Sequence, residues 1–355
     1  MKCQACNSEI NNPSRFSYTP TTMDKLKLFD EREILCCPEC GFGMIDQDVN
    51  DEVLAKYYHS EYSGKAKKRA ETISIDVKTE SSTDLRAISQ LSLIQQYVEL
   101  NNNSVILEIG AGAGGFLFAL RKAGYQGRYI AVEPQSQAHS FLEKHGAEVE
   151  KQTYTVSLAK KYESQVDLVF MSHSLEHFNP TLIPGIVASV FSMLKEGGCF
   201  FCEVPNADIQ KYPNAGERVV PHLSFFTEES LLSLFERLQF KIEFLKTCGQ
   251  PQLEKDHQKQ MQELQSGGYF EYEEDSETGI LRNRKYHEYL ELERGKQAKR
   301  QRRMLLLVSL LGYSRALKVL ELLRKIKKPG AVRLLGSQVF HYGDDREFIR
   351  SIAVK

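Results

Sequence analysis

The sequence lacks both a long hydrophobic run and an excess of charge of one sign. Its longest apolar run, Met304–Leu311, is far shorter than the roughly 20 residues that a transmembrane helix needs. The 46 Lys and Arg residues nearly balance 47 Asp and Glu, which does not favour nucleic acid as the default partner. The first ten residues, MKCQACNSEI, are polar, unlike a secretory signal. A soluble cytoplasmic protein is therefore expected.

The eight cysteines are expected to be metal ligands or buried thiols, because disulfides are rare in a reducing compartment. Four of them form two C-x-x-C pairs, Cys3 with Cys6 and Cys37 with Cys40. Two such pairs supply the thiolates of a tetrahedral Zn²⁺ site, and four thiolates leave no open position for catalysis. We therefore predict a structural zinc ion. Cys36 adjoins the second pair and stays an alternative to Cys37, and unrelated buried cysteines are the other interpretation.

A third C-x-x-C pair, Cys199 with Cys202, lies in the apolar run CFFCEV. This run has the composition of a buried strand, in which residues three apart point to opposite faces of the sheet. We therefore interpret these two cysteines as core residues.

Strand and helix signals alternate through the middle of the chain, which predicts a doubly wound, mostly parallel sheet with helices on both faces. The expected domains are a zinc ribbon (1–48), a helix and linker (49–83), the α/β core (84–248), a helical insertion (249–345) and a terminal strand (346–355). The expected strands cover 105–109, 129–133, 166–171, 199–204, 240–245 and 347–355, and the expected helices cover 51–63, 84–100, 115–123, 136–145, 181–194 and 228–238.

The insertion changes character along its length. Its early part is acidic and aromatic (YFEYEEDSE), whereas residues 294–328 hold twelve Lys or Arg against one acid, Glu321. Two helices interrupted near Gly312 are expected. They form either a hairpin with a solvated basic rim or a surface that meets anionic lipid or an anionic substrate.

The stretch SVILEIGAGAGGFL, residues 104–117, has glycines at 110, 112 and 115. Such glycines after a buried strand let the backbone approach a ligand, but the G-x-G-x-x-G pattern serves two ligand classes. The acid at the end of the strand, Glu108, would repel the pyrophosphate of a dinucleotide. It would attract the ammonium and sulfonium groups of S-adenosylmethionine, which is therefore the expected ligand.

The second strand of the core ends in AVEP, which places Glu133 about 25 residues after the first acid. A carboxylate there accepts hydrogen bonds from ribose hydroxyls. Both ligand classes contain that ribose, so Glu133 predicts a nucleoside without discriminating between them. The alternative is a surface acid before a helix.

At this point the sequence resembles the class I S-adenosylmethionine-dependent methyltransferases. The resemblance rests on ILEIGAGAGGFL, IAVEP, DLVFMSHSLEHFNP, LKEGGCFFCEVPN and PHLSFFTEESLLSLFERLQF, in that order, over roughly residues 85–245. SIAVK at the end looks like the terminal antiparallel strand of that family. The resemblance implies a seven-stranded Rossmann-like fold and methyl transfer from S-adenosylmethionine, and LEH is typical of members that act on small molecules.

The resemblance also implies where the cofactor binds. One group of residues would line the methionyl end, a second would hold the ribose, and a third would border the cofactor and the site of methyl transfer. These groups are Glu108, Gly110, Ala111, Gly112 and Gly114; Glu133, Pro134 and Gln135; and Ser172 and His173. The acid that often contacts the adenine is not evident, and Gln152 and Thr153 stand in its place.

Three histidines are candidate catalytic bases: His173, His177 and His222. PHLSFFT around His222 is similar to an H-x-S-Y-F-S segment of the sugar C-methyltransferases, which also begin with a four-cysteine zinc module. Those enzymes carry a second histidine and a tyrosine where this chain has GERVVPH, and a large C-terminal domain rather than an insertion. His177 could instead lock a loop with Glu176, and His222 could simply pack at a helix entry.

Three hypotheses follow. The first is an enzyme that methylates a small molecule or a glycan, such as a sugar nucleotide, a polysaccharide or a lipid-linked end, with the zinc module and insertion shaping the acceptor pocket. The second is an RNA methyltransferase that uses the basic segment 294–328, although no N-P-P-Y-type motif is present. The third is a non-catalytic, cofactor-binding scaffold. The acceptor and the oligomeric state stay open.

Overall fold

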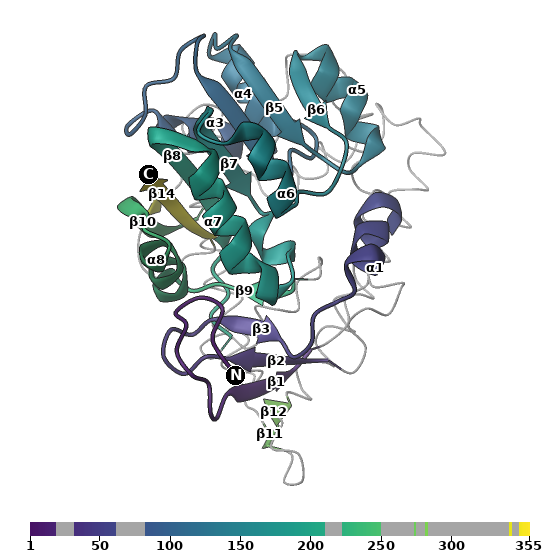
Figure 1. Ribbon diagram of the computed structural model, residues 1–355, viewed down its shortest axis with the longest axis vertical. Helices are drawn as coiled ribbons and strands as arrows, with labels where there is room; N and C mark the ends of the chain where they lie inside the picture. Colours follow the sequence, from purple (N-terminus) through teal and green to yellow (C-terminus); the bar gives the residue numbers. More distant parts are fainter. Residues whose placement is uncertain are drawn as a thin grey trace, which may run out of the picture. The chain divides into compact units, whose positions relative to one another are not determined.

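The computed structural model describes residues 1–18, 32–61, 82–209, 222–249, 273–274, 281–282, 341–342 and 348–355 (Figure 1). The chain divides into two compact units, residues 1–257 with 339–355 and residues 258–338. In the second unit, β11 (Glu273–Glu274) pairs antiparallel with β12 (Leu281–Arg282). The two helices and the basic surface expected for the insertion, and most of the expected linker, lie outside the described residues.

The first unit is built on a mostly parallel sheet (Figure 1). Its strands, in spatial order, are β13 (His341–Tyr342), β10 (Lys241–Gly249), β14 (Phe348–Val354), β8 (Leu194–Pro205), β7 (Val166–Ser172), β4 (Val105–Ile109), β5 (Arg128–Val132) and β6 (Ala147–Glu150). The strands from β8 to β6 pair in parallel, and β14 runs antiparallel between β8 and β10. This confirms the predicted sheet and the terminal strand, with the two-residue β13 added at its edge.

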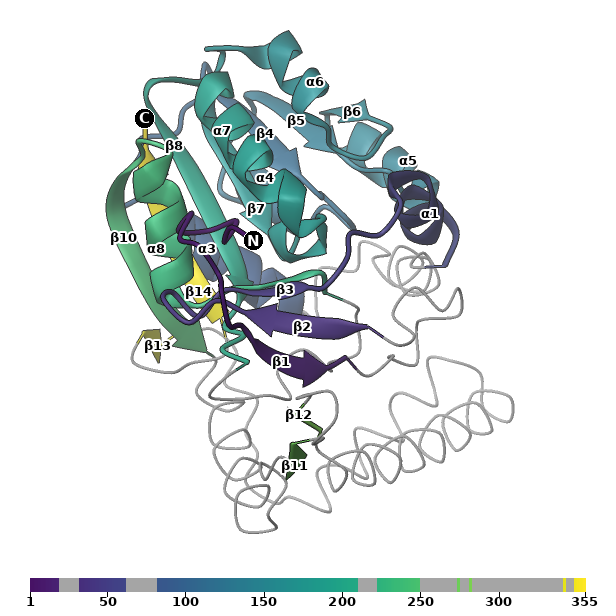
Figure 2. The ribbon, with the colours of Figure 1, turned by 60° about the horizontal axis from the view of Figure 1, so that its bottom comes forward.

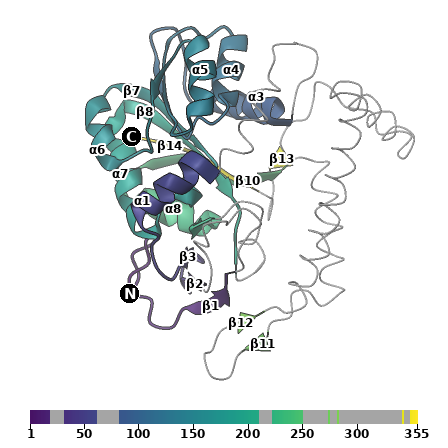
Figure 3. The same ribbon diagram turned by 90° about the vertical axis from the view of Figure 1, so that its right-hand side faces the viewer.

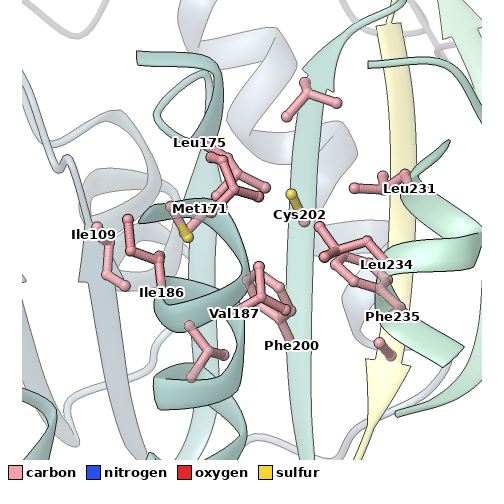
Figure 4. Close-up of a cluster of buried hydrophobic side chains, with 14 of the residues drawn as sticks. Ile109, Met171, Leu175, Ile186, Val187, Phe200, Cys202, Leu231, Leu234 and Phe235 are labelled. Atoms are coloured by element: carbon pink, nitrogen blue, oxygen red, sulfur yellow. The ribbon is translucent and has the colours of Figure 1, made fainter. Parts of the chain in front are cut away.

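Helices cover both faces of this sheet, as expected (Figure 3). On one face lie α3 (Ser82–Ile94), α4 (Gly115–Lys122) and α5 (Ser136–Lys144), and on the other lie α6 (Val156–Ala159), α7 (Ile183–Met193) and α8 (Glu228–Arg237). Successive residues of a strand serve opposite faces, so the parallel strands are apolar on both sides. Figure 4 shows one face, where Phe200 and Cys202 of β8 lie between side chains of α7 and α8.

The interpretation of the third cysteine pair is confirmed. Cys199 and Cys202 are both buried in β8, and they belong to the clusters on opposite faces of the sheet.

Some element boundaries differ from the prediction. Helix α3 ends at Ile94 rather than near residue 100, because a turn at 95–97 follows it. The predicted helix 51–63 is present as α1 (Asp51–Lys56) followed by one π-helical turn (Tyr57–Glu61). The edge strand β6 and the short helix α6 were not predicted, since AEVE and VSLA are too short to show a clear period. No helix among the described residues is long and apolar enough to cross a membrane.

A second, smaller antiparallel sheet is formed by β1 (Ser14–Ser17), β2 (Glu33–Cys36), β3 (Gly43–Ile45) and β9 (Ser224–Phe225) (Figure 2). The first three strands come from the predicted ribbon, whereas β9 comes from the segment PHLSFF of the core. Two side-chain hydrogen bonds add to this pairing: Thr227 Oγ1 donates to the Cys40 carbonyl (2.7 Å) and Arg237 Nη2 donates to the Gln4 carbonyl (2.6 Å). The ribbon is therefore bonded to the N-terminus of α8 and to the core.

A buried ion pair joins the last strand to the sheet. The guanidinium of Arg350 in β14 donates through Nε to Glu203 of β8, and its Nη1 donates to Ser89 Oγ of α3 (2.9 Å). Both charged side chains are fully buried. Glu203 also lies 3.6 Å from Arg86 Nε and accepts a hydrogen bond from Gln90 Nε2 (2.9 Å), but Arg350 is its one fully buried cationic partner among the described residues. Removing one partner of a buried pair is strongly destabilising.

We therefore predict that Arg350→Met lowers the free energy of unfolding by about 3–5 kcal/mol, measured by urea denaturation. Arg128→Met is the matched control, since Arg128 is also a strand arginine but its partner Glu148 is more than half exposed. Its loss should cost less than about 1 kcal/mol. Equal losses from the two substitutions would contradict the importance of the buried pair.

Candidate active site

A cavity of about 800 Å³ lies beside the carboxyl ends of β4, β5 and β7. Open α/β sheets bind ligands at this edge, where the loops after the strands meet. One wall comes from α1, through Asp51, Leu54 and Ala55. The side chain of Asn179 fixes the entry to this helix, because it bonds both the amide and the carbonyl of Val49 (2.9 and 2.7 Å).

The loop after β4 provides a second wall. Gly110 and Gly112 have φ angles of +81° and +52°, which disfavour any side chain. The amide of Gly110 donates to the Val132 carbonyl (2.9 Å), and Ser174 Oγ donates to the Ile109 carbonyl (2.8 Å). Gly110, Ala111 and Gly112 line the cavity, as expected.

Gly114 does not line the cavity, contrary to the expectation from the resemblance. It is the N-cap of α4 with φ +73°, and a Cβ there would meet Leu142 and Phe141 of α5 at 2.9 and 3.1 Å. This glycine therefore allows close packing of two helices, and Gly115 takes its place in the wall.

Glu133, directly after β5, forms hydrogen bonds that stabilise the glycine loop. Its carboxylate accepts hydrogen bonds from the amides of Gly112 (2.6 Å) and Gln135 (2.8 Å). Burial raises the pKa of this carboxyl, and the two amides oppose that shift. Glu133, Pro134 and Gln135 all line the cavity, so the predicted ribose-binding residues lie together.

Glu108 lines the same cavity from the end of β4. Its side chain is buried, and Oε2 accepts a hydrogen bond from the hydroxyl of Tyr129. Burial raises the pKa of the Glu108 carboxyl to about 8, and the charge of Glu133 adds to the shift. A cation placed beside Glu108 would reverse this shift, because an opposite charge favours the ionised form.

Ser172 ends β7, and the loop after it carries His173 and His177; all three residues line the cavity. His173 has φ +55°, which is uncommon for a residue with a side chain. Its Nδ1 lies 3.3 Å from Glu176 Oε1, and its Nε2 lies 3.3 Å from Glu203 Oε1. Burial lowers the pKa of His173, but the two carboxylates outweigh it and the net shift is upward.

His222, the third candidate base, lies behind this wall and is not among the residues that line the cavity. Its ring is buried, with its centroid 5.0 Å from that of His177. Ligand atoms of Glu176, His177 and His222 all lie within 4.8 Å of one another. Burial favours the protonated form of Glu176, but the contact with His173 and the charges of His177 and His222 hold its pKa at about 2.

The four predicted zinc ligands converge in the ribbon. Sγ of Cys3 lies 3.6 Å from Sγ of Cys40, and Sγ of Cys6 lies 3.8 Å from Sγ of Cys37. All four sulfur atoms lie within 4.8 Å of one another, and Cys36 is not part of the group. Zn–S bonds of about 2.3 Å in a tetrahedron hold sulfurs roughly 3.8 Å apart, so the arrangement matches the donor set of a zinc site.

The position of Gln152 does not support the expected contact with the adenine. Gln152 is exposed and does not line the cavity, whereas Thr153 does, together with Tyr154. Two polar residues that the sequence reasoning missed also line it: Arg86 and Gln90 of α3. Their signal was weak, because they are polar positions on an amphipathic helix.

The cavity, the glycine loop and the acids after β4 and β5 together occupy the position of a cofactor site. Residues 84–244 match the family model described as a methyltransferase domain. Residues 84–244 therefore form a methyltransferase domain. Its core has the Rossmann-like fold of the class I enzymes. No curated protein matches the sequence.

Several solved methyltransferases resemble this one in structure. A phosphoethanolamine N-methyltransferase from Haemonchus contortus is 14% identical with a TM-score of 0.37, covering 75% of this chain, which spans about half (52%) of that protein. A Burkholderia thailandensis 1,6-didemethyltoxoflavin-N1-methyltransferase is 17% identical, with a TM-score of 0.38 and coverage of 61% and 88%. An S-adenosylmethionine-dependent methyltransferase from Archaeoglobus fulgidus is 18% identical, with a TM-score of 0.39 and coverage of 78% and 95%.

We predict that Gly110→Ala destabilises the methyltransferase more than Gly112→Ala does, measured by urea denaturation. Both residues have positive φ, which costs an alanine about 1–2 kcal/mol. At 110 the new Cβ would also lie 2.2 Å from Ser174 Oγ, so the hydrogen bond from Ser174 to Ile109 is lost at a further cost of about 1 kcal/mol. At 112 nothing lies within 4 Å. Equal destabilisation would show that Ser174 does not buttress the loop.

Proposed function

We propose that this methyltransferase binds S-adenosylmethionine in the cavity and transfers its methyl group to a small-molecule or carbohydrate acceptor. The observation that carries the donor assignment is the buried carboxyl of Glu108 beside the glycine loop. The cavity volume of about 800 Å³ lies within the range of about 300–1,000 Å³ that small-molecule sites occupy.

Charge favours this donor over a dinucleotide. A pyrophosphate beside the glycine loop would lie close to Glu108 and Glu133, and the charge of Glu133 already disfavours the ionisation of Glu108. An ammonium group in the same place would neutralise the ionised form of Glu108. Glu133 would still have the hydrogen-bonding capacity to accept from ribose hydroxyls, since a carboxylate has about four acceptor sites.

The chain's contribution to methyl transfer is chiefly to hold donor and acceptor in line, because the cofactor itself supplies the leaving group. His173 and His177 are the candidate bases with access to the cavity. Either would accept a proton from an acceptor hydroxyl. His173 is fixed between Glu176 and Glu203, while His177 stacks edge-on against Tyr58 at 5.6 Å between ring centroids.

The acceptor is proposed to be a sugar nucleotide, a polysaccharide or a lipid-linked glycan. The similarity of PHLSFF and the cysteine module to the sugar C-methyltransferases supports this class. The ribbon lies close to this segment, because β3 pairs with β9, which begins two residues after His222. In this proposal Cys3, Cys6, Cys37 and Cys40 hold a structural Zn²⁺ that stiffens the ribbon against the wall of the acceptor site.

Calorimetric titration with S-adenosylhomocysteine tests the donor. We expect micromolar binding and no binding of NAD under the same conditions. The affinity should rise with pH between 6 and 8, by at most about tenfold per unit, because the raised pKa of Glu108 means that a proton must leave before the ligand ammonium is neutralised. Above pH 8 this dependence should end.

Glu108→Gln is the control for that titration. It should bind more weakly and lose the rise between pH 6 and 8, because the amide does not ionise. Binding of NAD in place of S-adenosylhomocysteine would refute the donor assignment. An unchanged pH profile in Glu108→Gln would refute the role of its carboxyl.

Adjacent alanine substitutions test the zinc ligands. Cys37→Ala should bind one zinc ion fewer per chain than Cys36→Ala, measured by metal analysis of the purified full-length proteins. Cys37 Sγ lies within the sulfur cluster, whereas Cys36 is a buried thiol outside it. Equal zinc contents in the two variants would contradict the assignment.

A further inference from the structure

A second group of metal-ligand side chains lies away from the ribbon cysteines, in the wall of the cavity. It comprises Glu176, His177 and His222, whose ligand atoms lie within 4.8 Å of one another. Glu176 is 1% exposed, and its Oε1 lies 3.3 Å from His173 Nδ1 and 3.9 Å from His177 Nε2, although neither carboxylate oxygen forms a well-oriented hydrogen bond with a described residue. A buried carboxylate in that state is costly unless it is paired or coordinates a metal.

Backbone hydrogen bonds help to hold the three side chains together. Glu176 and His177 occupy one 3-10 turn (Leu175–His177), and His222 comes from a segment more than 40 residues away. The amide of Leu223 donates to the carbonyl of Glu176 (2.9 Å). The hydroxyl of Tyr18, from the ribbon, accepts from the amide of His222 and donates to its carbonyl (both 3.1 Å).

We infer that Glu176, His177 and His222 form a binding site for a divalent transition metal ion at the wall of the cavity. Two imidazoles and one carboxylate suit zinc, iron, cobalt or manganese, and three protein ligands leave positions open. Magnesium and calcium take oxygen ligands instead. Bonds of about 2.1 Å hold neighbouring ligand atoms roughly 3–3.5 Å apart, so binding draws the three side chains together by small rotations.

The surroundings fit this assignment. His173 Nδ1 lies 3.3 Å from Glu176 Oε1, which is the kind of contact that orients a ligating carboxylate. His177 lines the cavity while Glu176 and His222 lie behind it. A metal held by these three residues would therefore adjoin, at His177, the space in which the acceptor is proposed to bind.

The metal site would specify the acceptor of the proposed methyl transfer. Its role in catalysis therefore rests on the proposed function. An acceptor hydroxyl bound to the metal gives its proton to water more readily. Its oxygen then forms the bond to the methyl carbon, and the electron pair of the breaking carbon–sulfur bond goes to the sulfonium sulfur, which leaves as neutral S-adenosylhomocysteine. The site thus favours an acceptor that offers an oxygen to the metal, and O-methylation.

Titration with Co²⁺ tests the site in the full-length protein, with any histidine tag removed and the ribbon first loaded with zinc. We expect one Co²⁺ per chain, with weak visible bands typical of nitrogen and oxygen ligands rather than thiolate. Glu176→Gln and His222→Asn should each bind Co²⁺ roughly tenfold more weakly or worse, since even losing a group that only orients a ligand costs about 10–100-fold. His145→Asn, at the end of α5, should bind it as the wild type does.

Binding of S-adenosylhomocysteine and the zinc content of the ribbon report on the fold of each variant and keep the two proposals apart. Wild-type protein that binds S-adenosylhomocysteine but no Co²⁺ overturns this inference and leaves the donor assignment standing. Wild-type protein that binds Co²⁺ but not S-adenosylhomocysteine overturns the donor assignment and leaves the metal site standing. Equal Co²⁺ affinity in the wild type, Glu176→Gln and His222→Asn overturns the inference, because the ion then binds elsewhere.

Discussion

The candidate site depends on one short segment, residues 222–227, which hydrogen-bonds to the ribbon on one side and to the LEH turn on the other. Its residue Leu223 donates to Glu176 through its amide and accepts from the amide of Ile45 at its carbonyl (3.1 Å). Thr227 caps α8 and at the same time donates to Cys40. The cysteine module is therefore linked by hydrogen bonds to the segment that carries His222, and through Leu223 to the turn that carries Glu176. The ribbon is part of the site's support rather than a separate attachment.

Most of the fold could be predicted from local patterns in the sequence. The strands β4, β5, β7 and β8 contain apolar runs, and the helices between them have clear amphipathic spacing, so their order and type could be predicted. The cysteine spacing likewise predicted which sulfurs converge. It could not separate Cys36 from Cys37, because neighbouring residues of a strand differ only in the face they present. In the structure Cys37 Sγ lies in the sulfur cluster, whereas Cys36 ends β2 outside it.

Features that depend on contacts between distant segments could not be predicted. The strand β9 has two residues and exists only because β3 lies beside it. The approach of His222 to Glu176, and the packing of α1 over the cavity through Asn179, join segments more than 40 and about 130 residues apart. The packing of Gly114 against α5 could not be predicted for a related reason. A glycine in a G-x-G pattern can serve a ligand or a neighbouring helix, and only the position of Leu142 and Phe141 shows which.

Four buried glutamates around one cavity show how partners, rather than residue type, set the chemistry of the site. Glu203 and Glu176 keep low pKa values because Arg350 and the histidines supply positive charge. Glu108 has a hydroxyl and a second acid as neighbours, so burial dominates and raises its pKa to about 8. In the described part of the chain no cationic side chain forms an ion pair with Glu108. The buried acids beside β8 and β14 therefore have cationic partners, whereas Glu108, beside β4 and β5, has none among the described residues. A ligand that brings an ammonium group to the glycine loop supplies that cation.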